Sequence, residues 1–360
     1  MSSGQNNFAF TNKLYQILSR KPGNVFFSPF SLHVLLAIAY QGARNVTLET
    51  IQKVLQIPAA SYKNIIHHLT TLENVQLSIA FKINLKKEKR LLVSFENTAK
   101  DYFDSEVEPM DFTQNTETTR KTKNSIDEIL VSLPFLTLRS TLYFKSDWAL
   151  PFCESKTHER SFYLNDDDVV QVQMTKDRKK VPYKYDKDLD SQILILPYAG
   201  DEVHMVIILP KEKNGIGNLE VALSKMDLRE VFTELRHRKV DVFLPRFKFE
   251  RSTVMDDVVK EMGLGVIYDQ DKADFTGVVE LETGENLYVN GIVQQACIDV
   301  NEKGTEAAAV AEIEPTVSTG AKIYPARRFI VDHPAIFMIV AGSGENTTIL
   351  FCGKLSHPEY

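Results

Sequence analysis

The chain has 360 residues and a net charge of −6 at pH 7, and 43% of its residues are hydrophobic while 25% are charged. This composition is typical of a soluble globular protein. The acidic balance speaks against a nucleic acid as the main partner. No apolar stretch is long enough to predict membrane insertion, and three cysteines without a C-x-x-C pair predict neither a disulfide framework nor a zinc site.

Helical and strand patterns follow one another irregularly over the first half of the chain. Apolar side chains repeat at helical spacing over residues 10–18 and stop at Pro22. Ser28 stands before a proline and a long apolar run, which predicts a capped and largely buried helix. Residues 77–85 alternate between apolar and polar side chains, which predicts a strand, and residues 95–103 predict a helix.

The second half of the chain is richer in strands. The patterns predict a strand–turn–strand unit at 192–209, helices at 219–235 and 254–262, a long strand at 286–300, and two apolar strands at 329–340 and 347–353. Because strands and helices show no β–α–β rhythm, the expected class is α+β. No Pro-, Gly- or Ser-rich linker interrupts the sequence, so we expect a single domain over residues 1–360.

The first twenty residues contain no apolar core of the kind that a secretory signal peptide needs. We therefore expect a cytoplasmic protein, or one that reaches the outside of the cell by an uncleaved or non-classical route. Asn45 and Asn346 each begin an N-x-[ST] sequon, which matters only if the chain enters the secretory pathway.

The stretch from residue 304 to residue 317 alternates with a period of two. Its glutamates at 306, 312 and 314 share one parity, and the other parity carries no charge. That is the pattern of a half-buried strand, although the segment is rich in alanine and longer than an ordinary strand. The pattern alone leaves two interpretations open: a loop that is able to become a strand, and an alanine-rich helix after a glycine turn.

Blocks of sequence along nearly the whole chain resemble those of the serpins, a family of serine protease inhibitors. One block resembles the hinge of the family's reactive-centre loop, through Glu302, Gly304, Thr305, Glu306, Ala307, Ala308 and Ala309. Other matching blocks lie at residues 24–32, 142–145, 196–200, 244–248, 273–277, 332–334 and 351–354. The resemblance implies a serpin-like α+β fold with a large mixed main sheet, smaller sheets, about eight or nine helices and an exposed loop at about 302–328.

The resemblance also implies a function. Inhibitory serpins are suicide substrates: a serine protease cleaves the loop, and the loop inserts into the main sheet as a new strand with the acyl-linked protease attached. The inserting parity here is small or apolar, so insertion would bury no unpaired charge. The expected partner is a serine protease and the expected state is a monomer without a cofactor. A non-inhibitory serpin acting as a chaperone, carrier or storage protein stays open as the alternative.

Counting along the family's loop from Glu302 gives a scissile bond between Ser318 and Thr319. Small side chains at this bond suit an elastase-like or permissive chymotrypsin-like protease. The segment after Thr319 is longer than in most serpins, so other positions stay open for the bait residue, the one that the protease recognises at the cleaved bond. A basic bait residue would indicate a trypsin-like target. These rival positions are Lys322, Tyr324 and Arg327.

Four polar residues match the family's shutter, the point where the main sheet opens. Ser28 and Ser31 match its serines, while Ser140 and Gln294 stand where the family usually has asparagine and histidine. Two interpretations stay open: these residues control the opening of the sheet, or they only satisfy the hydrogen bonds of polar groups buried in the core. Residues 116–139 are shorter than in the family, which leaves the rate of loop insertion open.

No catalytic motif is present: the chain has no G-x-S-x-G elbow, Walker loop or H-E-x-x-H pair. We therefore do not expect an enzyme. The short basic runs at 86–90, 236–239 and 327–328 are interpreted as solvated faces, with weak binding of a glycosaminoglycan as the alternative.

Overall fold

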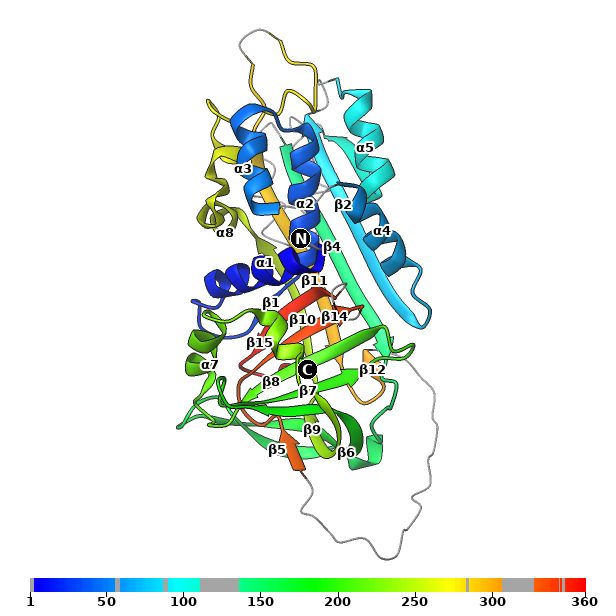
Figure 1. Cartoon of the computed structure of the whole chain (residues 1–360), viewed down its shortest axis with the longest axis vertical. Helices are drawn as coiled ribbons and strands as arrows, with labels where there is room; N and C mark the ends of the chain where they lie inside the picture. The colour runs from blue at the N-terminus through cyan, green and yellow to red at the C-terminus, as the bar shows by residue number, and fades with distance from the viewer. Residues whose placement is uncertain are drawn as a thin grey trace, which may run out of the picture.

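The computed structural model of the chain describes residues 3–55, 59–86, 90–110, 136–282, 285–305, 327–342, 344 and 347–360. Within these ranges the chain forms two mixed β-sheets and a set of helices gathered mostly at one end of an elongated molecule (Figure 1). The predicted α+β class and the mixed sheets are confirmed.

Seven α-helices lie in the described part of the chain, together with short 3-10 segments. They are α1 (Ser3–Leu18), α2 (Pro29–Gly42), α3 (Asn45–Leu55), α4 (Ala59–Thr70), α5 (Val93–Phe103), α7 (Ile216–Leu223) and α8 (Asp256–Val259). Helix α2 is buried over nearly its whole length, as its apolar composition predicts. The side chain of Ser28 caps this helix by accepting a hydrogen bond from the backbone N–H of Ser31 at 3.1 Å.

A six-stranded sheet runs along the upper part of the molecule in Figure 1. Its strands in spatial order are β10 (Phe247–Val254), β11 (Val289–Val300), β4 (Leu136–Asp147), β2 (Val75–Lys86) and β3 (Ser105–Met110), and the short β12 (Gly304–Thr305) pairs with β4. The two central strands β11 and β4 are parallel and directly paired, and we call their ladder the seam.

A nine-stranded sheet occupies the other end of the molecule. Its strands in spatial order are β1 (Val25–Phe27), β15 (Thr348–Leu355), β14 (Ala335–Ala341), β8 (Val203–Pro210), β7 (Ser191–Pro197), β6 (Val169–Asp186), β9 (Arg236–Pro245) and β13 (Arg327–Ile330), with β5 (His158–Tyr163) beside β6. Strands β14 and β15 are buried throughout, as expected for apolar runs covered on both faces.

Several predicted elements are confirmed, and two boundaries were wrong. The predicted helix at 219–235 ends at Leu223, and a separate 3-10 turn follows because the Asp227 carboxylate accepts the N–H of Arg229 and starts a new turn. The predicted strand at 329–340 is split into β13 and β14 around Pro334, which cannot donate to a ladder. Helix α4 and the long strand β6 were not predicted.

Candidate functional site: the hinge and the seam of the six-stranded sheet

The hinge lies where β11 ends and the chain turns back toward β4. After Val300 the chain reverses, and Gly304 and Thr305 pair antiparallel with Asp147 and Ser146. The hinge therefore begins a new strand at the end of the seam between β11 and β4. The rest of the predicted loop lies outside the described residues until Arg327, which opens β13 and is exposed. The residues outside include Glu306, Ala307, Ala308, Ala309, Ser318, Thr319, Lys322 and Tyr324.

Gly304 is fixed by close backbone contact. Its φ is +145°, and a Cβ at this position would lie 2.2 Å from the carbonyl oxygen of Ser146 and 2.5 Å from the Cα of Asp147. Only glycine adopts this backbone and fits this space. The β12–β4 pairing thus depends directly on the glycine of the predicted hinge.

The turn before Gly304 is anchored by a buried carboxylate. The side chain of Glu302 is only 3% exposed, and the Nε of Arg246 donates to both of its oxygens at 2.9 Å, while Nη2 lies 2.8 Å from Oε1. The hydroxyl of Thr157 donates to the same carboxylate. Burial raises the pKa of the Glu302 carboxyl, but these hydrogen bonds outweigh burial and hold the pKa below its usual value. Glu302 therefore stays ionised at neutral pH.

The segment after β4 holds the backbone of the same turn. The indole N–H of Trp148 donates to the carbonyl of Asn301 at 2.9 Å, and its backbone N–H donates to the carbonyl of Lys303 at 2.8 Å. The N–H of Phe152 donates to the carbonyl of Glu302 at 2.8 Å. The indole itself stacks on Tyr198, with ring centroids 4.3 Å apart and planes 13° from parallel. Three successive carbonyls of the hinge turn are thus tied to one rigid segment.

The four predicted shutter residues converge in the middle of the seam. Ser140 of β4 and Gln294 of β11 are direct partners in the parallel ladder, and both side chains reach the start of α2. The hydroxyl of Ser140 lies 3.1 Å from that of Ser31, and the Nε2 of Gln294 lies 2.7 Å from the same hydroxyl. The side chain of Ser31 therefore contacts both strands at once.

Gln294 also bonds to the backbone of Ser28. Its Oε1 accepts from the N–H of Ser28 at 2.7 Å, and its Nε2 donates to the carbonyl of Ser28 at 2.7 Å. The Ser28 hydroxyl donates to the carbonyl of Leu350 in β15 at 2.6 Å. Ser28, Ser31, Ser140 and Gln294 are all at most 1% exposed, so these bonds form without competition from water.

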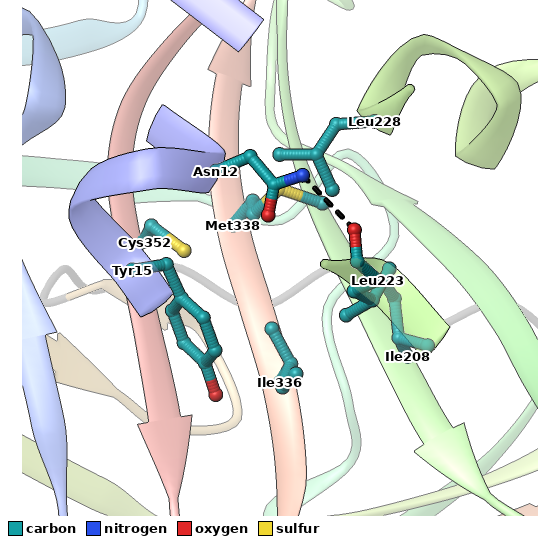
Figure 2. A pocket seen from close by; sticks show the side chains of 8 residues that line it. All are labelled: Asn12, Tyr15, Ile208, Leu223, Leu228, Ile336, Met338 and Cys352. Carbon is teal, nitrogen blue, oxygen red and sulfur yellow. Dashed lines mark hydrogen bonds between the residues drawn. The ribbon is translucent and has the colours of Figure 1, made fainter. Parts of the chain in front are cut away.

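A small apolar cavity lies apart from the hinge and the seam (Figure 2). It is bounded by α1, α7 and the nine-stranded sheet, and its lining side chains are Asn12, Tyr15, Ile208, Leu223, Leu228, Ile336, Met338 and Cys352. Its volume is about 10 Å³. That is room for about one water molecule, so the cavity could not hold an organic ligand without rearrangement.

Neither a metal centre nor a membrane span stands out among the residues that the structure describes. No three His, Cys, Asp or Glu side chains among them gather in an arrangement that could hold a metal ion. No helix in the same ranges is long and apolar enough to cross a membrane.

Sequence reasoning missed the partners of Glu302. Arg246 stands between β9 and β10 inside the conspicuous block at 244–248, and Thr157 precedes β5. The only sequence signal for Arg246 was its position in a strand region that also contains Lys248. Nothing in the pattern connects it to a carboxylate so distant in the chain.

The hinge thus pairs with β4 at one end of the seam, and at its middle four buried polar side chains hydrogen-bond to one another and to the backbone. The model of the family Serpin (serine protease inhibitor) matches residues 4–358, and the chain belongs to this family.

Individual relatives agree with that assignment. The chain is 33% identical over 371 residues to an uncharacterized serpin-like protein of Thermococcus kodakarensis, covering 98% of this chain and 84% of that protein. It is 31% identical over 383 residues to the leukocyte elastase inhibitor of Bos taurus, covering 99% of each. The crystal structure of Serpin48 from the insect Tenebrio molitor matches with a TM-score of 0.84 at 29% identity, covering 99% of this chain and 98% of that one.

Proposed function

We propose that this protein is a suicide-substrate inhibitor of serine proteases that traps its target by inserting the cleaved loop between β11 and β4. The observation that carries the proposal is the pairing of β12 with the end of β4, because it supplies both the start and the register of an inserted strand. The proposal treats residues 1–360 as one inhibitory domain that acts as a monomer.

Extending this register indicates which loop side chains would be buried. Each further loop residue would meet the preceding residue of β4, so Ala307 would stand opposite Phe144 and Ala309 opposite Leu142, both fully buried. The same register would end at Pro315 opposite Leu136, the first residue of β4. The uncharged parity of the loop thus matches the buried face of the strand, and little of the inserted ladder would depend on a proline.

Two of the three glutamates on the charged parity of the loop would meet a cation on the other face. In the same register Glu306 would stand opposite Lys145, and Glu312 opposite Arg139. Opposite charges directly across a strand pair stabilise it by roughly 0.2–1 kcal/mol each. The chain therefore supplies both apolar and ionic complementarity for the inserted strand.

The target class follows from the bait residues. A bond between Ser318 and Thr319 offers small side chains, which suit an elastase-like or permissive chymotrypsin-like pocket. Of the rivals, Lys322 and Tyr324 stay open, while Arg327 is the weakest because it is hydrogen-bonded in β13 beside Val240, and proteases bind substrates as unpaired extended chains.

The test is incubation with pancreatic elastase, chymotrypsin and trypsin, read by denaturing gels and intact mass. We expect an adduct that survives SDS and a released peptide that begins at Thr319. The cleaved chain should unfold at a temperature higher by at least ~10 °C, because the new ladder adds about ten hydrogen bonds. A peptide that begins after Lys322 or Tyr324 would move the bait bond and keep the mechanism.

A pair of variants isolates insertion from cleavage. Ala309→Arg would put a charge opposite buried Leu142, so we expect cleavage without an adduct. Ala308→Arg, opposite half-buried Tyr143 on the other face, should still trap the protease. Clean cleavage of the unmodified chain, with no adduct and no thermal gain, would refute the inhibitor and favour the non-inhibitory alternative. The cavity near α1 lends that alternative no support as a carrier, given its size. A cytoplasmic location stays a prediction.

A further inference from the structure

Cationic side chains gather on one face of the nine-stranded sheet, across β5, β6, β9 and β13. We call this group the basic face, and its members are Arg160, Lys176, Arg178, Lys180, Lys239 and Arg328. All six are exposed. The register brings them together: Lys180 is the direct partner of Lys239, and both Arg178 and Arg328 are partners of Asp241.

The carboxylate of Asp241 lies among these cations. Arg178 holds Asp241 in a two-pronged pair, with Nε 2.6 Å from Oδ1 and Nη2 3.1 Å from Oδ2. That pair lowers the pKa of Asp241, and Lys176 and Arg328 lower it further, so both lie close to the carboxylate. Within the described ranges, Lys176, Lys180, Lys239 and Arg328 form no ion pair of their own. The face is strongly positive although the chain as a whole carries −6.

Part of this arrangement works against the stability of the fold. Lys180 and Lys239 stand directly opposite each other on adjacent strands, and like charges in that position destabilise a sheet. Lys176 lies over the ring of Phe243 at 5.2 Å, and Arg160 lies over the same ring at 4.6 Å, so the cationic stems also cover an apolar surface. An external anionic partner would relieve the repulsion that the fold leaves in place.

The basic face lies between the two ends of the bait loop. Strand β13, which carries Arg328, begins where the loop returns to the described structure. Strand β6 reaches the hinge, where the loop begins. The Nζ of Lys179 in β6 donates to the carbonyl of Pro151 at 3.1 Å, and the next residue, Phe152, bonds to the hinge turn. Figure 1 shows β6 and β9 in the same lower part of the molecule as β12. A protease that engages the loop would therefore come close to this face.

We propose that the basic face is a docking surface for the target protease and selects proteases whose surface beside the active site is acidic. The inference rests on the proposed inhibitory function, and it adds a second determinant of specificity to the bait bond. Complementary charge of this kind acts mainly on the rate of association, which it raises by about 10- to 1000-fold at low ionic strength.

The test compares two forms of one protease that differ in charge. Pancreatic elastase is used unmodified and with its surface lysines succinylated, each at a concentration set by active-site titration. The rate of loss of intact inhibitor is followed from low to high salt, whether the product is an adduct or a cleaved chain. We expect the succinylated form to react at least ~10-fold faster at low salt, with the difference vanishing at high salt. Subtilisin, treated in the same way, replaces elastase if elastase leaves the loop intact.

Two triple variants separate the basic face from net charge. The first is Lys180→Glu, Lys239→Glu and Arg328→Glu, which should invert the preference between the two forms and leave the adduct yield per cleavage unchanged. The second reverses three exposed lysines elsewhere, Lys21→Glu, Lys100→Glu and Lys225→Glu, and should keep the preference of the unmodified chain.

The docking surface would be overturned by equal responses of the two triple variants, or by the absence of any difference between the two protease forms. It would also be overturned if added heparin accelerated the reaction of both protease forms and the first triple variant lost this acceleration. The last result would assign the face to a polysaccharide. Loss of intact chain without any adduct would instead count against trapping, while the charge preference would still be measured.

Discussion

The hinge and the shutter lie on the same pair of strands, yet they are held in different ways. The hinge turn is fixed to the segment after β4 by Trp148 and Phe152 and to Arg246 by an ion pair. The bonds of Trp148 and Phe152 join the ends of β4 and β11 beyond the ladder itself. At the shutter, Ser31 contacts Ser140 of one strand and Gln294 of the other.

The difference separates two tasks in the proposed mechanism. When β4 and β11 part, the hinge turn can stay attached to the end of β4, while Ser31 must give up its contact with Ser140 or with Gln294. Besides the backbone ladder between the two strands, the neutral hydrogen bonds of the shutter would resist opening, and the charged hinge would fix the register from which insertion starts. The predictions below test this separation.

The largest effect is expected at the ion pair of the hinge. Arg246→Ala would leave the buried carboxylate of Glu302 without its cation, and we expect a loss of about 3 kcal/mol in the free energy of unfolding, at the low end for a buried pair because Arg246 is 29% exposed. Arg20→Ala is the control, since its pair with Glu261 is largely exposed and should change stability by no more than ~0.5 kcal/mol. Equal losses in urea denaturation would contradict the anchoring role.

Gly304→Ala should be the next most harmful change. The added Cβ would meet backbone atoms of Ser146 and Asp147 in a conformation that alanine avoids, so β12 must detach, at a cost of about 2 kcal/mol. Gly217→Ala is the matched control: it lies in α7, its Cβ would meet nothing within 4 Å, and alanine should gain ~0.5–1 kcal/mol there. Thermal unfolding of the two variants should shift in opposite directions. A neutral Gly304→Ala would mean that the hinge does not depend on this backbone.

Two variants of the shutter should lower the free energy of unfolding by different amounts. Gln294→Leu removes the bonds to both backbone groups of Ser28 and to the Ser31 hydroxyl, so we expect a loss of roughly 1–2 kcal/mol. Ser140→Ala removes one contact and should cost less than ~1 kcal/mol.

Hydrogen exchange can assign these losses to their regions. Amides of β4 and β11 should exchange faster in Gln294→Leu, while Arg246→Ala should speed exchange mainly in the hinge turn. The same exchange pattern in both variants would remove the distinction between gate and anchor.

Sequence patterns predicted the elements around the seam better than the contacts that hold it. Strand alternation and the cap at Ser28 follow from local rules, so β11, β2 and α2 could be predicted from the residues alone. The two hydrogen bonds between the side chain of Gln294 and the backbone of Ser28 could not be predicted, because they depend on how the start of α2 lies under the ladder.

The basic face illustrates the same limit. The run at 236–239 was interpreted as a solvated face, and in sequence it is short and isolated. The positive charge of the face is concentrated by the register of β9 with β6 and β13, which brings Lys180 and Arg328 beside this run. Since β6 itself was not predicted, no reading of the sequence could have assembled these charges.

The smallest expected effect concerns the pH dependence of the hinge. The folded pKa of Glu302 lies below its unfolded value, so its contribution to stability is fully present above the unfolded pKa, about 4.3, and is lost as the pH falls through the folded pKa. Comparing the unmodified chain with Glu302→Gln by urea denaturation from pH 7 to pH 3, we expect the stability difference to shrink at the acid end. A constant difference across this range would mean that the carboxylate acts through shape and hydrogen bonding and not through its charge, and the contrast between a charged hinge and a neutral shutter would then fail.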